Sequence, residues 1–179
     1  MSSVLVPLFA GFEEIEAVTI IDVLRRANIE VITVSLDQLT VIGAHAIAII
    51  ADTTLDKVEP SKFDAIVLAG GAGTFRLRED PRIAAILKAQ AKVNKLVAAI
   101  CAAPTVLSDA GLLKGKRATS FPAVQEQLEV GEYLTDAVVV DGNVITSRGA
   151  GTAMVFALKL VEVLRGEAIA NKLAKDMLV

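Results

Sequence analysis

Residues 96–107 read LVAAICAAPTVL, and this stretch joins two structural patterns at one cysteine. Residues 96–100 form a short continuous apolar run, which predicts a strand buried on both faces. A helix is predicted to follow it and to end at about Ala110, with Pro104 in its first turn. A buried strand that turns directly into a helix lifts Cys101 above the edge of the sheet, in the geometry of a nucleophile elbow.

The same alternation of strands and helices extends from this stretch to both ends of the chain. Apolar runs predict strands at residues 4–8, 30–35, 65–68, 138–140 and 144–147. Apolar spacing and capping residues predict helices at residues 13–27, 80–93, 152–164 and 167–177. A hairpin is expected around Gly43, and Asp141 with Gly142 predicts a second hairpin turn. This order favours an open, doubly wound, mostly parallel α/β sheet with helices on both faces.

Composition bounds the class of protein. The 179 residues are 54% hydrophobic but only 4% aromatic, a mixture that suits parallel strands covered by helices. We expect a single domain over residues 1–179, with no membrane association, because the apolar runs are far shorter than the roughly 20 residues of a spanning helix. A net charge of −3 without a basic cluster argues against nucleic-acid binding. A single cysteine and a start unlike a signal peptide favour a cytoplasmic location.

Cys101 is the candidate reactive residue. At a helix start, free backbone N–H groups and the positive end of the helix dipole stabilise a negative sulfur, so we expect a depressed cysteine pKa. The small side chains of Ala102 and Ala103 let the backbone approach a bound molecule. The alternative is a buried cysteine that acts as a small hydrophobe, which composition by itself favours. The position at a strand-to-helix junction favours the reactive thiolate.

Three acidic residues, Glu13, Glu14 and Glu16, open the first predicted helix. A favourable interaction with the helix dipole explains Glu13 and Glu14. Glu16 stands four residues before Ile20 and heads the buried stripe, where an unpaired carboxylate is costly and its pKa is raised. A protonated Glu16 can hydrogen-bond a thiolate and can act as a general acid and base. Spacing alone leaves Glu13 as an alternative, because it lies on nearly the same face.

Two loops and two basic side chains are secondary candidates. The loop at residues 70–73 follows a buried strand, and its N–H groups, from Gly70 and Gly71, are placed to line an oxyanion site, with a tight turn as the alternative. Arg148 is a candidate anion anchor or the partner of a surface salt bridge. His45, the one histidine, is either a site residue or merely exposed. Neither this loop nor the loop at residues 147–152 matches a dinucleotide or phosphate motif, and one histidine with one cysteine cannot supply a zinc cluster, so no cofactor is expected.

Several motifs in one order make the chain resemble the ThiJ/PfpI superfamily, and within it the branch of the Parkinsonism-associated deglycase and its bacterial relatives. The resemblance covers nearly the whole chain. The motifs are EEIEAV at 13–18, VLRRA at 23–27, LAGG at 68–71, AAICAAPT at 98–105 and TSRGAGT at 146–152.

The resemblance implies a flavodoxin-like fold and a homodimer, with Cys101 as nucleophile and Glu16 as its protonated partner. It also implies that the N–H groups of Gly71 and Ala102 form the oxyanion site. The implied activity is that of a cofactor-free glyoxalase, which turns small 2-oxoaldehydes such as methylglyoxal into 2-hydroxy acids such as lactate, or of a deglycase acting on their protein adducts. The implied alternative is an oxidative-stress sensor or chaperone, in which Glu16 holds the cysteine oxidised to a sulfinate.

The sequence departs from the superfamily pattern at two positions. Phe121 stands where some relatives carry a histidine near the cysteine, and Ala102 stands where the peptidase branch has one. A cysteine peptidase or amidase therefore lacks a well-placed histidine. A flavin carrier would need a Ser/Thr-rich phosphate loop after the first strand, whereas residues 10–14 are acidic there. His45 falls where a relative has an arginine near the pocket, in a stretch that aligns poorly.

Overall fold

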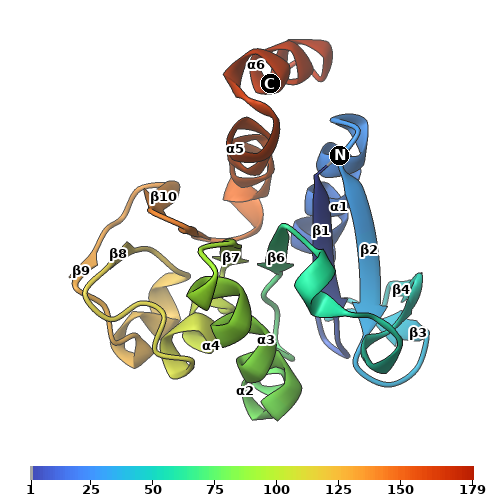
Figure 1. The fold of residues 1–179 in the computed structure, drawn as a ribbon, viewed down its shortest axis with the longest axis vertical. Coiled ribbons are helices and arrows are strands. Elements are labelled where there is room, and N and C mark those ends of the chain that lie inside the picture. Colours follow the sequence, from blue (N-terminus) through green and yellow to red (C-terminus); the bar gives the residue numbers. More distant parts are fainter. Residues whose placement is uncertain (1) are drawn as a thin grey trace.

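The computed structural model describes residues 2–179 and has the expected open α/β sheet (Figure 1). Seven strands pair in the order β10-β11-β7-β6-β1-β2-β5. Only β10 and β11 run antiparallel among the strand pairs of this sheet in the described residues. The strands are β1 (Ser3–Leu8), β2 (Glu30–Ser35), β5 (Thr53–Thr54), β6 (Ala65–Leu68), β7 (Leu96–Ile100), β10 (Val138–Asp141) and β11 (Val144–Ser147).

The helices cover both faces of the sheet. The crossover from β1 to β2 and the crossover from β6 to β7 run in opposite directions across the sheet, so their right-handed turns place α1 and α3 on opposite faces. Helix α5 packs against α1, and α6 continues from α5 at the end of the molecule away from α2 (Figure 1). The helices are α1 (Glu14–Arg26), α2 (Phe75–Glu79), α3 (Pro81–Lys92), α4 (Pro104–Asp109), α5 (Ala153–Arg165) and α6 (Glu167–Asp176).

The sequence predictions for the long elements are confirmed. Strands β2, β6 and β7 have the predicted bounds, and α3 begins with Asp80 as its cap and Pro81 at its first position. The short elements are not in the prediction. They are α2, β5, the pair β8 (Arg117–Ala118) and β9 (Glu132–Tyr133), and four 3₁₀ turns at Leu55–Lys57, Pro60–Lys62, Pro122–Gln127 and Ala150–Thr152. These segments lack the continuous apolar run that identified β6 and β7, and they are too short to show a helical period.

The core lies between the sheet and its helices. Every residue of β6 and β7 is buried, which agrees with their continuous apolar sequences and with parallel strands covered on both faces. The buried apolar side chains form one cluster in space, and its members come from nearly the whole chain, from Val4 to Ala170. Within residues 2–179, no helix has the length and apolar character that crossing a membrane requires.

A small hairpin of β3 (Thr40–Ile42) and β4 (Ala48–Ile50) stands apart from the main sheet. It confirms the hairpin predicted around Gly43. The Gly11 N–H donates to the carbonyl of Ile42 at 2.8 Å, and the Ala44 N–H donates to the carbonyl of Phe12 at 2.8 Å. The hairpin is therefore fastened to the segment that joins β1 to α1.

Strands β1, β6 and β7 are neighbours in the sheet, so their carboxyl ends meet at one edge. Backbone hydrogen bonds tie the connecting segments together there. The Glu13 N–H donates to the Gly70 carbonyl at 2.8 Å, and the Gly73 N–H donates to the Gly11 carbonyl at 2.9 Å. Ligands of open α/β sheets bind outside this edge, which makes it the place to look for the site.

Candidate active site

Cys101 occupies the turn between β7 and α4 in a conformation that few side chains adopt. Its φ is +64°, in the left-handed region, where a residue other than glycine is strained. The turn is held from both sides, because the Cys101 N–H donates to Ser147 at 3.0 Å and the Cys101 carbonyl accepts from Phe121 at 2.8 Å. The backbone thus follows the nucleophile-elbow geometry, and the side chain is partly exposed.

Glu16 lies in the first turn of α1 and is completely buried, with 0% of its surface exposed. Its Oε2 accepts a hydrogen bond of 2.8 Å from the Gly70 N–H. Its Oε1 is buried without a nitrogen or oxygen donor among residues 2–179, which leaves that atom for the neighbouring thiol. Glu13, the alternative left open by spacing, instead caps the helix, since its Oε2 accepts from the Glu16 N–H at 2.7 Å.

The backbone around the sulfur supplies hydrogen-bond donors. The backbone N–H groups of Gly71 and Ala102 lie near the Cys101 sulfur and favour its charged form. Gly70 leaves space for this approach, because a Cβ atom there would lie 2.7 Å from the Cys101 Cβ. The structure therefore brings together five of the residues singled out in the sequence, Cys101, Glu16, Gly70, Gly71 and Ala102.

The carboxyl and the thiol change each other's ionisation. Burial raises the pKa of Glu16 to about 7, against a smaller lowering by its hydrogen bonds to Gly70 and Cys101. Burial raises the pKa of Cys101 to about 12, and charge repulsion by Glu16 adds to the rise. The raised Glu16 pKa agrees with the sequence prediction. The predicted lowering of the Cys101 pKa is wrong while Glu16 is charged. Burial of the thiol and repulsion by Glu16 raise this pKa by more than the N–H groups of Gly71 and Ala102 lower it.

Between about pH 7 and pH 12, this pair holds one proton and one negative charge. When the proton moves from sulfur to Glu16, the repulsion disappears and the thiolate faces the two N–H groups of Gly71 and Ala102. Backbone donors aimed at a developing negative charge stabilise that charge without reorganisation. The arrangement can thus generate a nucleophile and a neighbouring acid in a single internal proton transfer.

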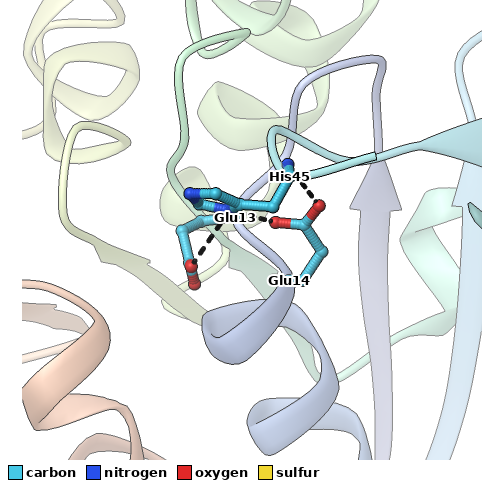
Figure 2. A group of neighbouring side chains, drawn as sticks. All are labelled: Glu13, Glu14 and His45. Carbon is cyan, nitrogen blue, oxygen red and sulfur yellow. Dashed lines mark hydrogen bonds and ion pairs between the residues drawn. The ribbon is translucent and has the colours of Figure 1, made fainter. Parts of the chain in front are cut away.

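His45 lies in the turn between β3 and β4, next to the first turn of α1 (Figure 2). Its Nδ1 lies 2.8 Å from Oε2 of Glu14 and 3.9 Å from Oε1 of Glu13. These three side chains place one ligand atom each within 4.8 Å, a spacing that also suits a metal ion. The Glu14 carboxylate is already occupied by protein donors, since Oε1 accepts from the His45 N–H at 2.6 Å.

The sequence offered two roles for Arg148, an anion anchor or the partner of a surface salt bridge. Among the described residues, Arg148 forms no salt bridge. One guanidinium nitrogen donates to the Thr135 carbonyl at 3.2 Å, and Nε is buried without a partner among those residues. Arg148 directly follows Ser147, whose carbonyl holds the Cys101 backbone. Its predicted role as an anion anchor stays a prediction.

A separate groove of about 700 Å³ opens at the ends of β1 and β2, between the hairpin and α2. Its lining includes Ser35, Asp37, Arg76 and Arg82, and neither Cys101 nor Glu16 is part of it. We assign the chemistry to the cysteine turn rather than to this groove, because a nucleophile, an acid and backbone N–H donors converge at the cysteine.

The sequence did not reveal the burial of Glu14, which is only 4% exposed. An acidic residue in the first turn of a helix is adequately explained by the helix dipole. The signal was Gly43, whose missing side chain makes room for Glu14, as a Cβ there would lie 2.3 Å from Oε1. That signal has meaning only when the hairpin is placed against α1.

The sequence and the structure of this chain both match members of one protein family. The DJ-1/PfpI family profile matches residues 2–163. The crystal structure of Drosophila melanogaster DJ-1beta superposes with a TM-score of 0.96 at 44% identity, covering 100% of this chain and 99% of that one.

Three curated relatives extend the comparison. Protein DJ-1 homolog B of Arabidopsis thaliana is 43% identical over 98% of this chain, which spans 41% of the length of that relative. The glutathione-independent glyoxalase DJR-1.2 of Caenorhabditis elegans is 40% identical over 92% of this chain and 89% of its own length. Deglycase PH1704 of Pyrococcus horikoshii is 37% identical over 76% of this chain and 84% of its own length.

Proposed function

Since the chain belongs to the DJ-1/PfpI family, we propose that it is a cysteine-dependent enzyme acting on small 2-oxoaldehydes, or on their protein adducts, with methylglyoxal converted to lactate. The observation that carries this proposal is the pairing of Cys101 with a buried Glu16 whose pKa is about 7. A general acid and base works best when its pKa lies near the working pH. Relatives named glyoxalase and deglycase support the same class of reaction.

The proposed reaction needs only these groups and water. The Cys101 thiolate adds to the aldehyde carbon, and the oxygen takes a proton to give a hemithioacetal. Glu16 removes the proton from that carbon while the neighbouring carbonyl oxygen takes up a proton, which gives an enediol. Glu16 then returns its proton to the second carbon as the first hydroxyl releases its own, which leaves a thioester of lactate. Water cleaves the thioester, releasing lactate and restoring the thiol. The N–H groups of Gly71 and Ala102 support the negative sulfur at the start and at the end of the cycle.

The test of this proposal is product analysis. The protein is incubated with methylglyoxal without glutathione, and lactate is measured by proton NMR against a sample without protein. We expect lactate to form in proportion to the methylglyoxal consumed. Consumption without lactate, explained by adducts on lysine and arginine, would count against an enzyme.

A second candidate function is oxidative-stress sensing, and one specific observation favours it. Glu16 Oε1 is buried beside the sulfur without a nitrogen or oxygen donor among the described residues, so it is available to hydrogen-bond an oxygen added to Cys101. We expect mild peroxide to add two oxygens to Cys101 before any of the three methionines is oxidised. Peptide mass spectrometry distinguishes the sites, and oxidation of methionine ahead of Cys101 contradicts the sensor.

We also propose that the chain forms a homodimer through an apolar surface next to the site. The surface combines Ile15 and Val18 of α1 with Ile47 and Ile50 of the β3–β4 hairpin, of which Ile50 is 74% exposed. These side chains lie on two segments that hydrogen-bond to each other, and exposed apolar side chains on neighbouring segments are typical of protein–protein interfaces. Light scattering should give about twice the 18.8 kDa mass of the chain, and Ile50→Glu should lower it toward one copy. A wild-type mass of one chain would refute this.

A further inference from the structure

Glu14 is a buried charged group that the proposed reaction does not use. Its carboxylate accepts three hydrogen bonds from the turn between β3 and β4, and those from His45 are drawn in Figure 2. Oε1 accepts from the backbone N–H of His45 at 2.6 Å and of Ile47 at 3.5 Å, and Oε2 lies 2.8 Å from His45 Nδ1. Burial of a carboxylate is costly unless it is fully hydrogen-bonded, and here the donors of one turn satisfy it. Burial raises the pKa of Glu14, but the hydrogen bonds from the His45 side chain and from the backbone N–H groups of His45, Glu14 and Ile47 together bring it below its usual value.

The turn at residues 43–47 is the outermost of three stacked segments that lead to the sulfur. The turn is bonded to the β1–α1 segment through Ala44 N–H to Phe12, and Ile42 O accepts from Gly11. The β1–α1 segment is in turn bonded to the glycine loop at 70–73, through Glu13 N–H to the Gly70 carbonyl at 2.8 Å. The glycine loop lies directly against the cysteine, since a Cβ at Gly70 would be 2.7 Å from the Cys101 Cβ, and its Gly71 N–H favours the charged form of the sulfur.

The three segments are in close van der Waals contact, and no space for an added methyl group remains between them at Gly71 or Gly43. A Cβ at Gly71 would lie 2.5 Å from both Glu13 N and Gly11 O, so the glycine loop touches the β1–α1 segment directly. On the outer side, a Cβ at Gly43 would lie 2.3 Å from Glu14 Oε1. A displacement of the turn is therefore passed on to the β1–α1 segment and from there to the N–H donors at the sulfur.

We propose that Glu14 is a positioning residue for the cysteine site: by clamping the 43–47 turn onto the β1–α1 segment, it fixes the Gly71 N–H in its direction toward Cys101. Through this contact Glu14 influences the stability of the charged Cys101 sulfur, which the Gly71 N–H stabilises, and Glu14 itself does not contact the substrate. This inference rests on the proposed function for its meaning in catalysis, but its effect on the sulfur is measurable without any turnover.

Two variants release the clamp in different ways. Glu14→Ala removes the carboxylate. Gly43→Ala leaves the carboxylate in the chain but places a methyl group where Oε1 now lies. The backbone of Gly43 is outside the left-handed region, so alanine is compatible with its conformation. Glu14→Gln keeps an oxygen acceptor for the backbone N–H groups and serves as the conservative variant. Asp22→Asn, which removes an exposed salt bridge to Arg26 on the same helix, is the matched control.

The main measurement is the rate of Cys101 alkylation by iodoacetamide as a function of pH, followed by mass spectrometry. We expect Glu14→Ala and Gly43→Ala to move the midpoint upward by about one pH unit, the effect of weakening one hydrogen bond to a charged sulfur. Glu14→Gln should restore most of the wild-type profile, and Asp22→Asn should match wild type. Hydrogen exchange of the His45 and Ile47 amides reports independently whether the turn has been released.

The inference is overturned if these amides lose their protection while the alkylation midpoint stays at the wild-type value. It is also overturned if Glu14→Gln is as defective as Glu14→Ala. If Glu14→Ala does not fold, Gly43→Ala decides the outcome by the same two measurements. Absence of lactate from wild-type protein would refute the proposed function, whereas the alkylation profiles would still test the clamp.

Discussion

Replacement of Cys101 by alanine should abolish lactate formation, with kcat/KM for methylglyoxal falling by about three orders of magnitude or more. The reason is that the sulfur forms the covalent bond through which the reaction proceeds. Within residues 2–179, no second cysteine offers an alternative nucleophile. Glu16 and the N–H groups of Gly71 and Ala102 would remain, but they would surround a methyl group.

The measurement is lactate production over a range of methylglyoxal concentrations. Circular dichroism and thermal unfolding should show that Cys101→Ala keeps the fold, because alanine also fits the elbow without a new clash. Ser61→Ala, which removes an exposed hydroxyl far along the chain from the elbow, is the control for handling and purity. If Cys101→Ala forms lactate at more than about one tenth of the wild-type rate, the cysteine mechanism is wrong.

Glu16→Gln should separate the two roles of the acid–thiol pair. Without an ionisable carboxyl, proton transfer between the two carbons is lost, and we expect kcat to fall by about two to four orders of magnitude. Alkylation of Cys101 should persist, because the amide removes the negative charge that helps to raise the pKa of the thiol. Turnover and alkylation must be measured on the same preparations. A parallel loss of both would indicate that the variant has only disordered the site.

The same variant should also change how stability depends on pH. Burial raises the Glu16 pKa from 4.5 to about 7, so the folded protein retains a proton that the unfolded chain has released. Stability from this group is fully present below about pH 4.5 and is lost as the pH rises through 7. For wild type, we expect this contribution to fall by about 3 kcal/mol between those limits. Urea unfolding at pH 5 and pH 8 should show a smaller difference for Glu16→Gln, and an unchanged difference would contradict the raised pKa.

The order of strands and helices could be predicted from local patterns, because a strand that is buried on both faces of the sheet has a continuous apolar sequence. The runs at β6 and β7 are continuously apolar and begin directly after Asp64 and Lys95, and turn signals follow them within a few residues at Gly70 and Pro104, so the type and position of both strands were predictable. The cysteine was placed at the elbow for the same reason, since a strand ends at Ile100 and Pro104 starts a helix. Strands as short as β8 and β9, two residues each, left no such signature.

The ionisation of the site could not be predicted from the same patterns. A helix start lowers a cysteine pKa, but desolvation and a carboxylate 85 positions away in the chain raise it further than the backbone donors lower it. Glu16 was a candidate because it heads an apolar stripe, with Glu13 left as the alternative, whereas Glu14 was missed because its partners lie in a hairpin about 30 residues away. Each error concerns a group whose environment comes from distant segments.

The sequence by itself determined the order of strands and helices, the elbow at Cys101 and the presence of a buried acid on α1, because apolar spacing and capping act between residues a few positions apart. Only the tertiary structure decided which donors reach the sulfur, how Glu16 and Cys101 share their proton, and that Glu14 holds a turn of the hairpin. Electrostatic energies depend on distance in space and on exclusion of water, and both are set when segments far apart in the chain pack together.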